Sequence, residues 1–135
     1  MSIAVERPAE RIDRVAGRPD AATAARWQAV CRVDDLEPAW GEAALVEGRQ
    51  IAVFRLGGPA GDEVYAVDHL DPHTSAPVMA RGIVGSRNDR PTVASPLHKE
   101  VYDLVTGECF SDPSLRLGAY RARVADGVLE VAIPA

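Results

Sequence analysis

The sequence predicts an all-β fold, an antiparallel β barrel or sandwich, on three observations. Short apolar or alternating segments recur from Trp27 to Ile133, and Gly, Pro, Asp or Asn interrupts them. The pair Asp126-Gly127 separates two such segments, which is a strong signal for a β-hairpin. No window of about 12 residues combines a helical period of apolar side chains with start and stop signals, so no long helix is expected.

The expected strands share apolar and β-branched or aromatic composition, and turn-forming residues bound them. They are 27–33, 42–46, 51–55, 64–67, 92–94, 101–104, 109–110, 119–124 and 128–133. We expect two irregular loops within a small subdomain inserted around residues 68–100, and the basic stretch 81–90 is interpreted as a solvated loop. Trp27 and Tyr65 are expected to fill the core.

Composition restricts the class of protein and its partners. The chain has 135 residues, of which 47% are hydrophobic and 26% charged, as in an ordinary globular domain with one core. The net charge of −5 disfavours nucleic acid and anionic membranes as partners, because both require clustered cations. No apolar run is long enough to span a bilayer.

The N-terminal residues differ from the rest of the chain. Residues 1–25 contain no aromatic residue and few large aliphatic ones, which predicts a mobile tail before a domain at 26–135. This tail has no apolar segment typical of a secretory signal, so we expect a cytoplasmic protein. Cys31 and Cys109 are too far apart in the sequence for a ligand motif, and we interpret both as small buried hydrophobic residues.

Two loops combine polar side chains, histidine and proline. They are the segments 68–73 and 95–99, and each follows an expected strand. Proline stiffens a loop and removes a backbone donor, so such loops hold their side chains in a defined position. Paired loops of this kind are typical of a metal site between two loop tips. His69, at the turn after a strand, is expected to be half exposed.

The same loops resemble those of the Rieske domain. In that family one loop carries Cys-x-His, and a later loop carries Cys-x-x-His before an aromatic-x-Leu-x-x-Gly run. This sequence has Asp71-Pro72-His73, then Ser95-Pro96-Leu97-His98, then the run 102–107. Both histidines therefore match the family pattern, whereas Asp71 and Ser95 replace the two cysteines.

That replacement decides the expected chemistry. A Rieske [2Fe–2S] centre takes two thiolates on one iron and two imidazoles on the other. A carboxylate and a neutral hydroxyl are hard oxygen donors, which suit an iron–sulfide cluster poorly. We therefore interpret Asp71, His73, Ser95 and His98 as vestigial cluster positions, and we expect no cofactor in this chain.

One branch of the Rieske-like family shares this loss. The run Arg81-Gly82-Ile83-Val84-Gly85, and Ser-Pro where Rieske proteins have Cys-Pro, resemble the small subunit of cytoplasmic assimilatory nitrite reductase over about residues 26–133. The resemblance implies a Rieske-like fold and an accessory role in NAD(P)H-dependent, six-electron reduction of nitrite to ammonium during nitrate assimilation. It also implies a large catalytic partner subunit that carries FAD, siroheme and an iron–sulfur cluster.

Two interpretations of the loop histidines stay open. The first is that His73 and His98 are surface side chains hydrogen-bonded at a former cluster site. The alternative is a mononuclear zinc or iron site formed by Asp71, His73 and His98, since two imidazoles and one carboxylate are suitable ligands. No catalytic residue is predicted.

The expected docking residues for the partner subunit are three arginines and one tryptophan, because Arg and Trp are enriched at interfaces. They are Arg81, Arg87, Arg90 and Trp40. Two other functions remain as alternatives. One is a Rieske-type ferredoxin-like electron carrier with atypical ligands, and the other is a stand-alone binding or mononuclear-metal protein on the same scaffold.

Overall fold

The computed structural model describes residues 25–58 and 61–134, so the predicted tail before residue 25 lies outside the described residues. Two short 3-10 turns, η4 (Val33–Asp35) and η5 (Met79–Arg81), accompany the strands. The strands are β1 (Ala25–Arg32), β2 (Gly41–Val46), β3 (Arg49–Gly58), β4 (Gly61–Asp68), β5 (Ile83–Arg87), β6 (Arg90–Ala94), β7 (Val101–Asp103), β8 (Ala119–Tyr120), β9 (Ala122–Ala125) and β10 (Val128–Pro134). Among these residues no helix has the length and apolar character needed to cross a membrane.

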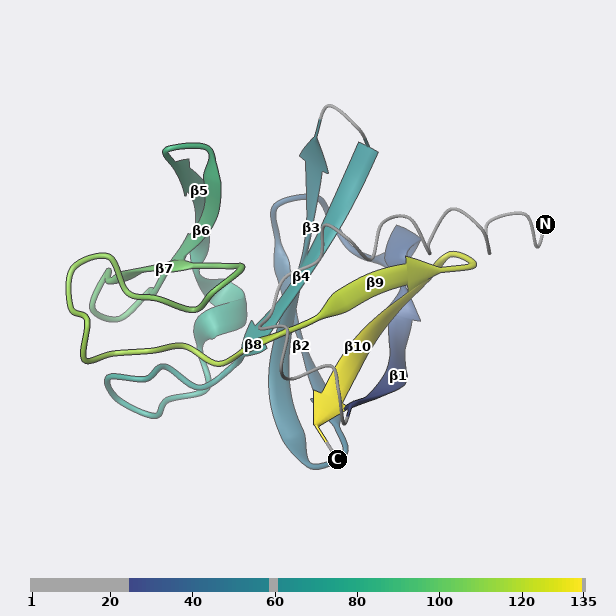
Figure 1. Cartoon of the computed structure of the whole chain (residues 1–135), viewed down its shortest axis with the longest axis horizontal. Coiled ribbons are helices and arrows are strands. Elements are labelled where there is room, and N and C mark those ends of the chain that lie inside the picture. Colours follow the sequence, from purple (N-terminus) through teal and green to yellow (C-terminus); the bar gives the residue numbers. More distant parts are fainter. Residues whose placement is uncertain (1–24, 59–60, 135) are drawn as a thin grey trace.

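The strands form three antiparallel sheets, which confirms the predicted all-β class. Their orders are β1-β10-β9, β2-β3-β4-β8 and β5-β6-β7. Figure 1 shows the first two sheets packed together on one side of the molecule and the third, with its long loops, on the other. The third sheet and its loops are the predicted inserted subdomain. It occupies the chain between β4 and β8 and is therefore longer than the expected 68–100.

The hairpin of β3 and β4 is buried on both faces. Ile51 and Val53 pack into a cluster with the first sheet, whereas Ala52 and Phe54 pack into a second cluster with the inserted subdomain. Since side chains alternate across a strand, a run of consecutive apolar residues is required at such a position. The expectation of one core is wrong, because this hairpin separates two.

A β-hairpin over residues 83–94 takes up most of the stretch 81–90, so this stretch is exposed to solvent as expected but is not a loop. β5 pairs with β6 from Ile83 opposite Ala94 to Arg87 opposite Arg90. Asn88 and Asp89 form the turn with φ angles of 53° and 66°. Asn and Asp tolerate this left-handed conformation, which two-residue hairpin turns require.

Three smaller predictions also change. The expected strand 119–124 is divided at Arg121, because β8 pairs with β4 while β9 pairs with β10. The expected strand 109–110 is reduced to an isolated bridge between Cys109 and Tyr102. Trp27 is only half buried, and the guanidinium of Arg123 lies 4.0 Å from its ring centroid.

Two other core predictions can be compared directly with the structure. Tyr65 is buried, as expected. Both cysteines are free thiols, and Cys109 is buried whereas Cys31 is half-buried. The prediction of a buried small hydrophobic residue is therefore confirmed at Cys109 and holds only partly at Cys31.

Candidate functional site at the two loop tips

The first loop is built around the carboxylate of Asp71. Its Oδ1 accepts hydrogen bonds from the backbone N–H groups of His73 at 2.6 Å and Thr74 at 3.3 Å. Its backbone carbonyl accepts another from the N–H of Ser75, which has a φ of 67°. The side chain of an Asp at the head of a turn thus satisfies the amides that the turn leaves unpaired.

The second loop repeats this turn with a different side chain. The Oγ of Ser95 accepts a hydrogen bond from the N–H of Leu97 at 3.3 Å, and its carbonyl accepts one from Lys99 at 3.0 Å. Lys99 has a φ of 63°, close to the 67° of Ser75, which is the equivalent residue of the first loop. The two loops therefore hold their first residues in matching positions.

A third copy of the turn begins at Asp103 and was not predicted. Asp103 Oδ1 accepts hydrogen bonds from Val105 and Thr106, and its carbonyl accepts one from Gly107, whose φ is 83°. A Cβ on Gly107 would lie 1.8 Å from the carbonyl oxygen of Leu117, so only glycine fits there. In all three turns, an Asp or Ser comes four residues before the residue with positive φ, and this spacing is the signal in the sequence.

The two loops meet through their first residues. The Oγ–H of Ser95 donates a hydrogen bond to Oδ2 of Asp71, and neither side chain reaches solvent. Burial by itself raises the pKa of Asp71. The hydrogen bonds from Ser95 and from the amides of the first loop, together with nearby His98, outweigh it and hold the pKa below its usual value. The Asp71–Ser95 pair is thus an ionised, hydrogen-bonded contact between the loops.

The two loop histidines lie together outside this pair. The rings of His73 and His98 are stacked, with centroids 4.3 Å apart and planes 14° from parallel. Nδ1 of His73 lies 3.2 Å from Oε2 of Glu100. Asp71 turns its carboxylate toward Ser95. In residues 25–58 and 61–134, no three His, Cys, Asp or Glu side chains are arranged to hold a metal ion.

The donor set does not fit a [2Fe–2S] cluster. Such a cluster needs two thiolates where this chain has Asp71 and Ser95, and these two side chains are in direct hydrogen-bond contact with each other. Next to them, the hydroxyl of Tyr102 is buried without a hydrogen-bond partner in the described residues. Burial, together with the negative charges around it, raises the pKa of Tyr102, so its hydroxyl stays protonated. That this chain carries no cluster remains a prediction.

The four predicted docking residues fall into two groups. Trp40 and Arg81 line the same pocket, and Trp40 is 68% exposed, as expected. Arg87 and Arg90 instead lie over the ring of Phe110, at 4.8 and 5.4 Å from its centroid.

Arg90 has a structural contact in addition. It forms an ion pair with the fully buried carboxylate of Asp103 and lies 3.5 Å from Glu108. Arg90 therefore compensates a buried charge, a role that its sequence position does not reveal.

His69 is buried, so the expectation of a half-exposed turn residue is wrong. Its backbone carbonyl accepts hydrogen bonds from Val78 and Met79, and its Nδ1 accepts one from the N–H of Ala80 at 3.1 Å. These bonds attach η5 to the end of β4. The ring is therefore part of the junction between the inserted subdomain and the sheets.

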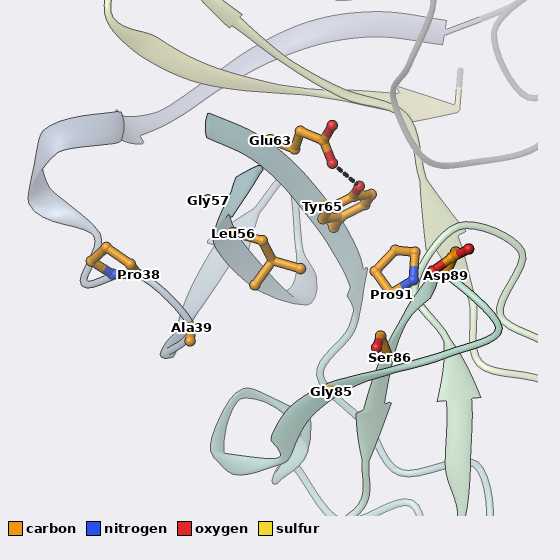
Figure 2. Close-up of a pocket in the computed structure, with 10 residues that line it drawn as sticks. All are labelled: Pro38, Ala39, Leu56, Gly57, Glu63, Tyr65, Gly85, Ser86, Asp89 and Pro91. Atoms are coloured by element: carbon orange, nitrogen blue, oxygen red, sulfur yellow. Dashed lines mark hydrogen bonds between the residues drawn. The ribbon is translucent and has the colours of Figure 1, made fainter. Parts of the chain in front are cut away.

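A second pocket, of about 620 Å³, lies between the β3–β4 hairpin and the β5–β6 hairpin (Figure 2). Leu56, Tyr65 and Pro91 supply apolar surface, and Glu63 and Asp89 supply negative charge. The hydroxyl of Tyr65 donates a hydrogen bond to Glu63 at 2.7 Å. The residues that line this pocket include no Lys, Arg or His to offset the two acids, which repel phosphates, so the pocket does not suit a nucleotide.

Comparison with known proteins agrees with this geometry. Residues 26–132 match the profile of the Rieske-like [2Fe-2S] domain. The nitrite reductase (NADH) small subunit of Salmonella typhimurium is 38% identical over 106 residues, which cover 78% of this chain and 96% of the relative. The chain belongs to the Rieske-like family of nitrite reductase small subunits. The predicted family and fold are therefore confirmed.

Other similar proteins extend this family assignment. A crystal structure from Mycobacterium tuberculosis, described as an NADH-dependent nitrite reductase small subunit, has a TM-score of 0.76 and 41% identity. The match covers 82% of this chain and 97% of that one. The large subunit of nitrite reductase [NAD(P)H] from Klebsiella oxytoca is 37% identical over 101 residues, which are 75% of this chain but only 10% of that protein. A domain like this one is therefore part of a large-subunit polypeptide in Klebsiella.

Proposed function

We propose that this chain is the accessory small subunit of an NAD(P)H-dependent nitrite reductase and binds its large catalytic subunit. The observation that supports this most strongly is the relationship to nitrite reductase small subunits across nearly their whole length. The Klebsiella protein adds a second argument, because joining two domains in one polypeptide is favourable when they act together.

The finer assignment concerns where the redox chemistry takes place. FAD, siroheme and an iron–sulfur cluster belong to the large subunit, which reduces nitrite to ammonium with six electrons in nitrate assimilation. The replacement of both cluster thiolates by Asp71 and Ser95 supports this division of roles. It also argues against a ferredoxin-like electron carrier. The complex acts in the cytoplasm, where NAD(P)H is available.

The contribution of this chain is a rigid surface for the large subunit. The hydrogen bond between Ser95 and Asp71 joins the two loops directly, so their prolines and polar side chains keep a defined position. Trp40 and Arg81 expose an indole and a guanidinium beside these loops, whereas Arg87 and Arg90 are engaged with Phe110. We therefore assign the docking face to the two loop tips together with Trp40 and Arg81. Arg87 and Arg90 lie at the edge of this face.

An activity assay tests this function. The large subunit is purified alone and with this chain, and nitrite-dependent oxidation of NADH and of NADPH is followed in both samples. We expect the two chains to co-purify and nitrite reduction to be faster with both present. Absence of a complex, together with equal activity in the two samples, would refute an accessory role.

A further inference from the structure

A surface pocket between β2 and η5 combines an exposed aromatic ring with hydrogen-bond donors. It has a volume of about 730 Å³, and we call it the Trp40 pocket. Trp40, His69, Pro77 and Arg81 line it, and Glu37 and Glu42 supply acidic groups in the same lining. The pocket lies next to the first loop, because Leu70 forms a β-bridge with Pro77.

The backbone that carries Trp40 is firmly held. The N–H of Trp40 donates to the carbonyl of Glu37 at 3.0 Å, and the N–H of Ala39 donates to the carbonyl of Arg55 at 2.8 Å. Gly41 then packs so closely on η5 that a Cβ would lie 2.4 Å from the carbonyl oxygen of Ala80. An exposed indole on a fixed backbone loses little conformational entropy when a partner covers it.

The interior of the pocket contains one hydrogen-bond donor in a fixed orientation. His69 is 9% exposed, and its Nδ1 accepts the N–H of Ala80, so the ring proton is on Nε2. Burial, and then the charge of Arg81, lower the pKa of His69, so the ring is neutral at pH 7. No group in the described part of the chain accepts from the Nε2–H of His69. The imidazole thus offers one N–H to whatever enters the pocket.

The charged groups of the lining come from different elements of the chain. Arg81 is exposed and forms no ion pair within residues 25–58 and 61–134, and it lies close enough to His69 to affect its titration. Glu37 and Glu42 are exposed acids carried by the turn before β2 and by β2 itself, whereas His69 follows β4 and Arg81 ends η5. A partner that complements this surface has a negative group for Arg81 and His69, and its positive groups face the two glutamates.

We propose that the Trp40 pocket binds a segment of the large subunit that inserts an Asp or Glu side chain. The carboxylate accepts hydrogen bonds from the Nε2–H of His69 and from the guanidinium of Arg81, and the apolar part of the segment covers the indole of Trp40. Hydrogen bonds from a cation to a carboxylate are among the stronger ones, and Trp and Arg dominate the binding energy of many interfaces. This inference rests on the proposed function, since it names the chemistry of the same partner.

Binding measurements with matched variants test the pocket. The dissociation constant between this chain and the purified large subunit is measured by titration calorimetry for wild type, R81E and W40A. Each variant should weaken binding at least tenfold. L45A removes an exposed apolar side chain of β2 outside the pocket, and R32E reverses an exposed charge on β1 in the first sheet, so both controls should change binding less than twofold.

A photocrosslink identifies the occupant. With p-benzoylphenylalanine in place of Trp40, the crosslinked peptide should come from the large subunit and contain an Asp or Glu. Changing that acid to Arg should weaken wild-type binding and restore binding of R81E. In the complex, the Nε2–H proton of His69 should exchange with water more slowly than in the free chain.

The outcomes separate the two proposals. If the wild-type chain does not bind the large subunit at all, the proposed function fails and this inference fails with it. If wild type binds but R81E and W40A bind equally well, only the pocket assignment is refuted. A crosslink to a second copy of this chain, a peptide without an acid, or unchanged exchange of the His69 proton would also overturn it.

Discussion

Replacing Ser95 by alanine removes the hydrogen bond that joins the two loops. Oδ1 of Asp71 keeps its two backbone donors, but Oδ2 loses the hydroxyl and stays buried. A hydrogen bond to a charged group contributes about 1.5–3 kcal/mol, and an unsatisfied buried acceptor adds to the loss. We therefore expect S95A to lower the free energy of unfolding by about 2–3 kcal/mol at pH 7, which is the loss of this hydrogen bond together with the cost of the unsatisfied oxygen.

Thermal and urea unfolding measure this loss. For a chain of this size, about 1 kcal/mol corresponds to roughly 3–5 °C in Tm, so S95A should unfold about 6–15 °C lower. Far-UV circular dichroism follows the transition. The matched control is S86A, which removes the hydroxyl of an exposed strand serine and should change the free energy of unfolding by less than about 0.5 kcal/mol.

The pH dependence of this loss identifies the carboxylate as the partner. The pKa of Asp71 is lowered in the folded state, so its ionised form stabilises the fold above its ordinary value near 3.9. That contribution is lost as pH falls from this value through the lowered pKa, because the unfolded chain then binds more protons. The difference between wild type and S95A should therefore be constant above about pH 5 and become smaller below pH 4.

A double-mutant cycle with D71N completes the test. If the interaction is direct, S95A and D71N together should destabilise less than the sum of the single changes, by at least about 1 kcal/mol. An S95A protein within about 0.5 kcal/mol of wild type at pH 7 would refute the argument that this pair holds the loops. So would a loss of stability that does not change with pH.

Three further predictions concern other parts of the site. R90A should lower the free energy of unfolding by about 1–3 kcal/mol in urea titrations, because it leaves the buried carboxylate of Asp103 without its cation. G107A should be destabilised by about 3 kcal/mol or more in thermal scans, since its methyl group meets a backbone carbonyl at a positive φ. After anaerobic incubation with iron and sulfide, D71C/S95C should gain the visible absorption of a Rieske cluster and wild type should not. A coloured wild-type protein would contradict the last prediction.

Much of the fold could be predicted from the sequence, because strand signals are local. Alternating apolar residues, the Asp126-Gly127 turn and the continuous apolar runs that became β3 and β4 depend only on neighbours along the chain. Residues 92–94 were expected as a strand, but the first strand of that hairpin was missed. Its two apolar residues, Ile83 and Val84, are followed by Gly, Ser and Arg, and four of its five residues are exposed. The division of 119–125 between two sheets was missed for another reason, since it depends on which distant strands are available to pair.

The candidate site shows the same limit more sharply. The order of residues was enough to align Asp71, His73, Ser95 and His98 with a Rieske pattern and to conclude that the thiolates are missing. It could not show that Asp71 is buried against Ser95, or that the two imidazoles stack beside Glu100. Those contacts join residues more than 20 positions apart, and hydrogen-bond distance is a property of packing.

What the sequence by itself determined is the class of fold, the family and the loss of the cluster ligands, because each depends on residue types at fixed spacings. Only the tertiary structure decided which arginines remain available to a partner. Arg81 and Arg90 look alike in the sequence, but Arg90 compensates a buried carboxylate and Arg81 faces an open pocket beside Trp40. The physical reason is that the energy of a charge depends on the solvent and the charges around it, and folding alone brings these together.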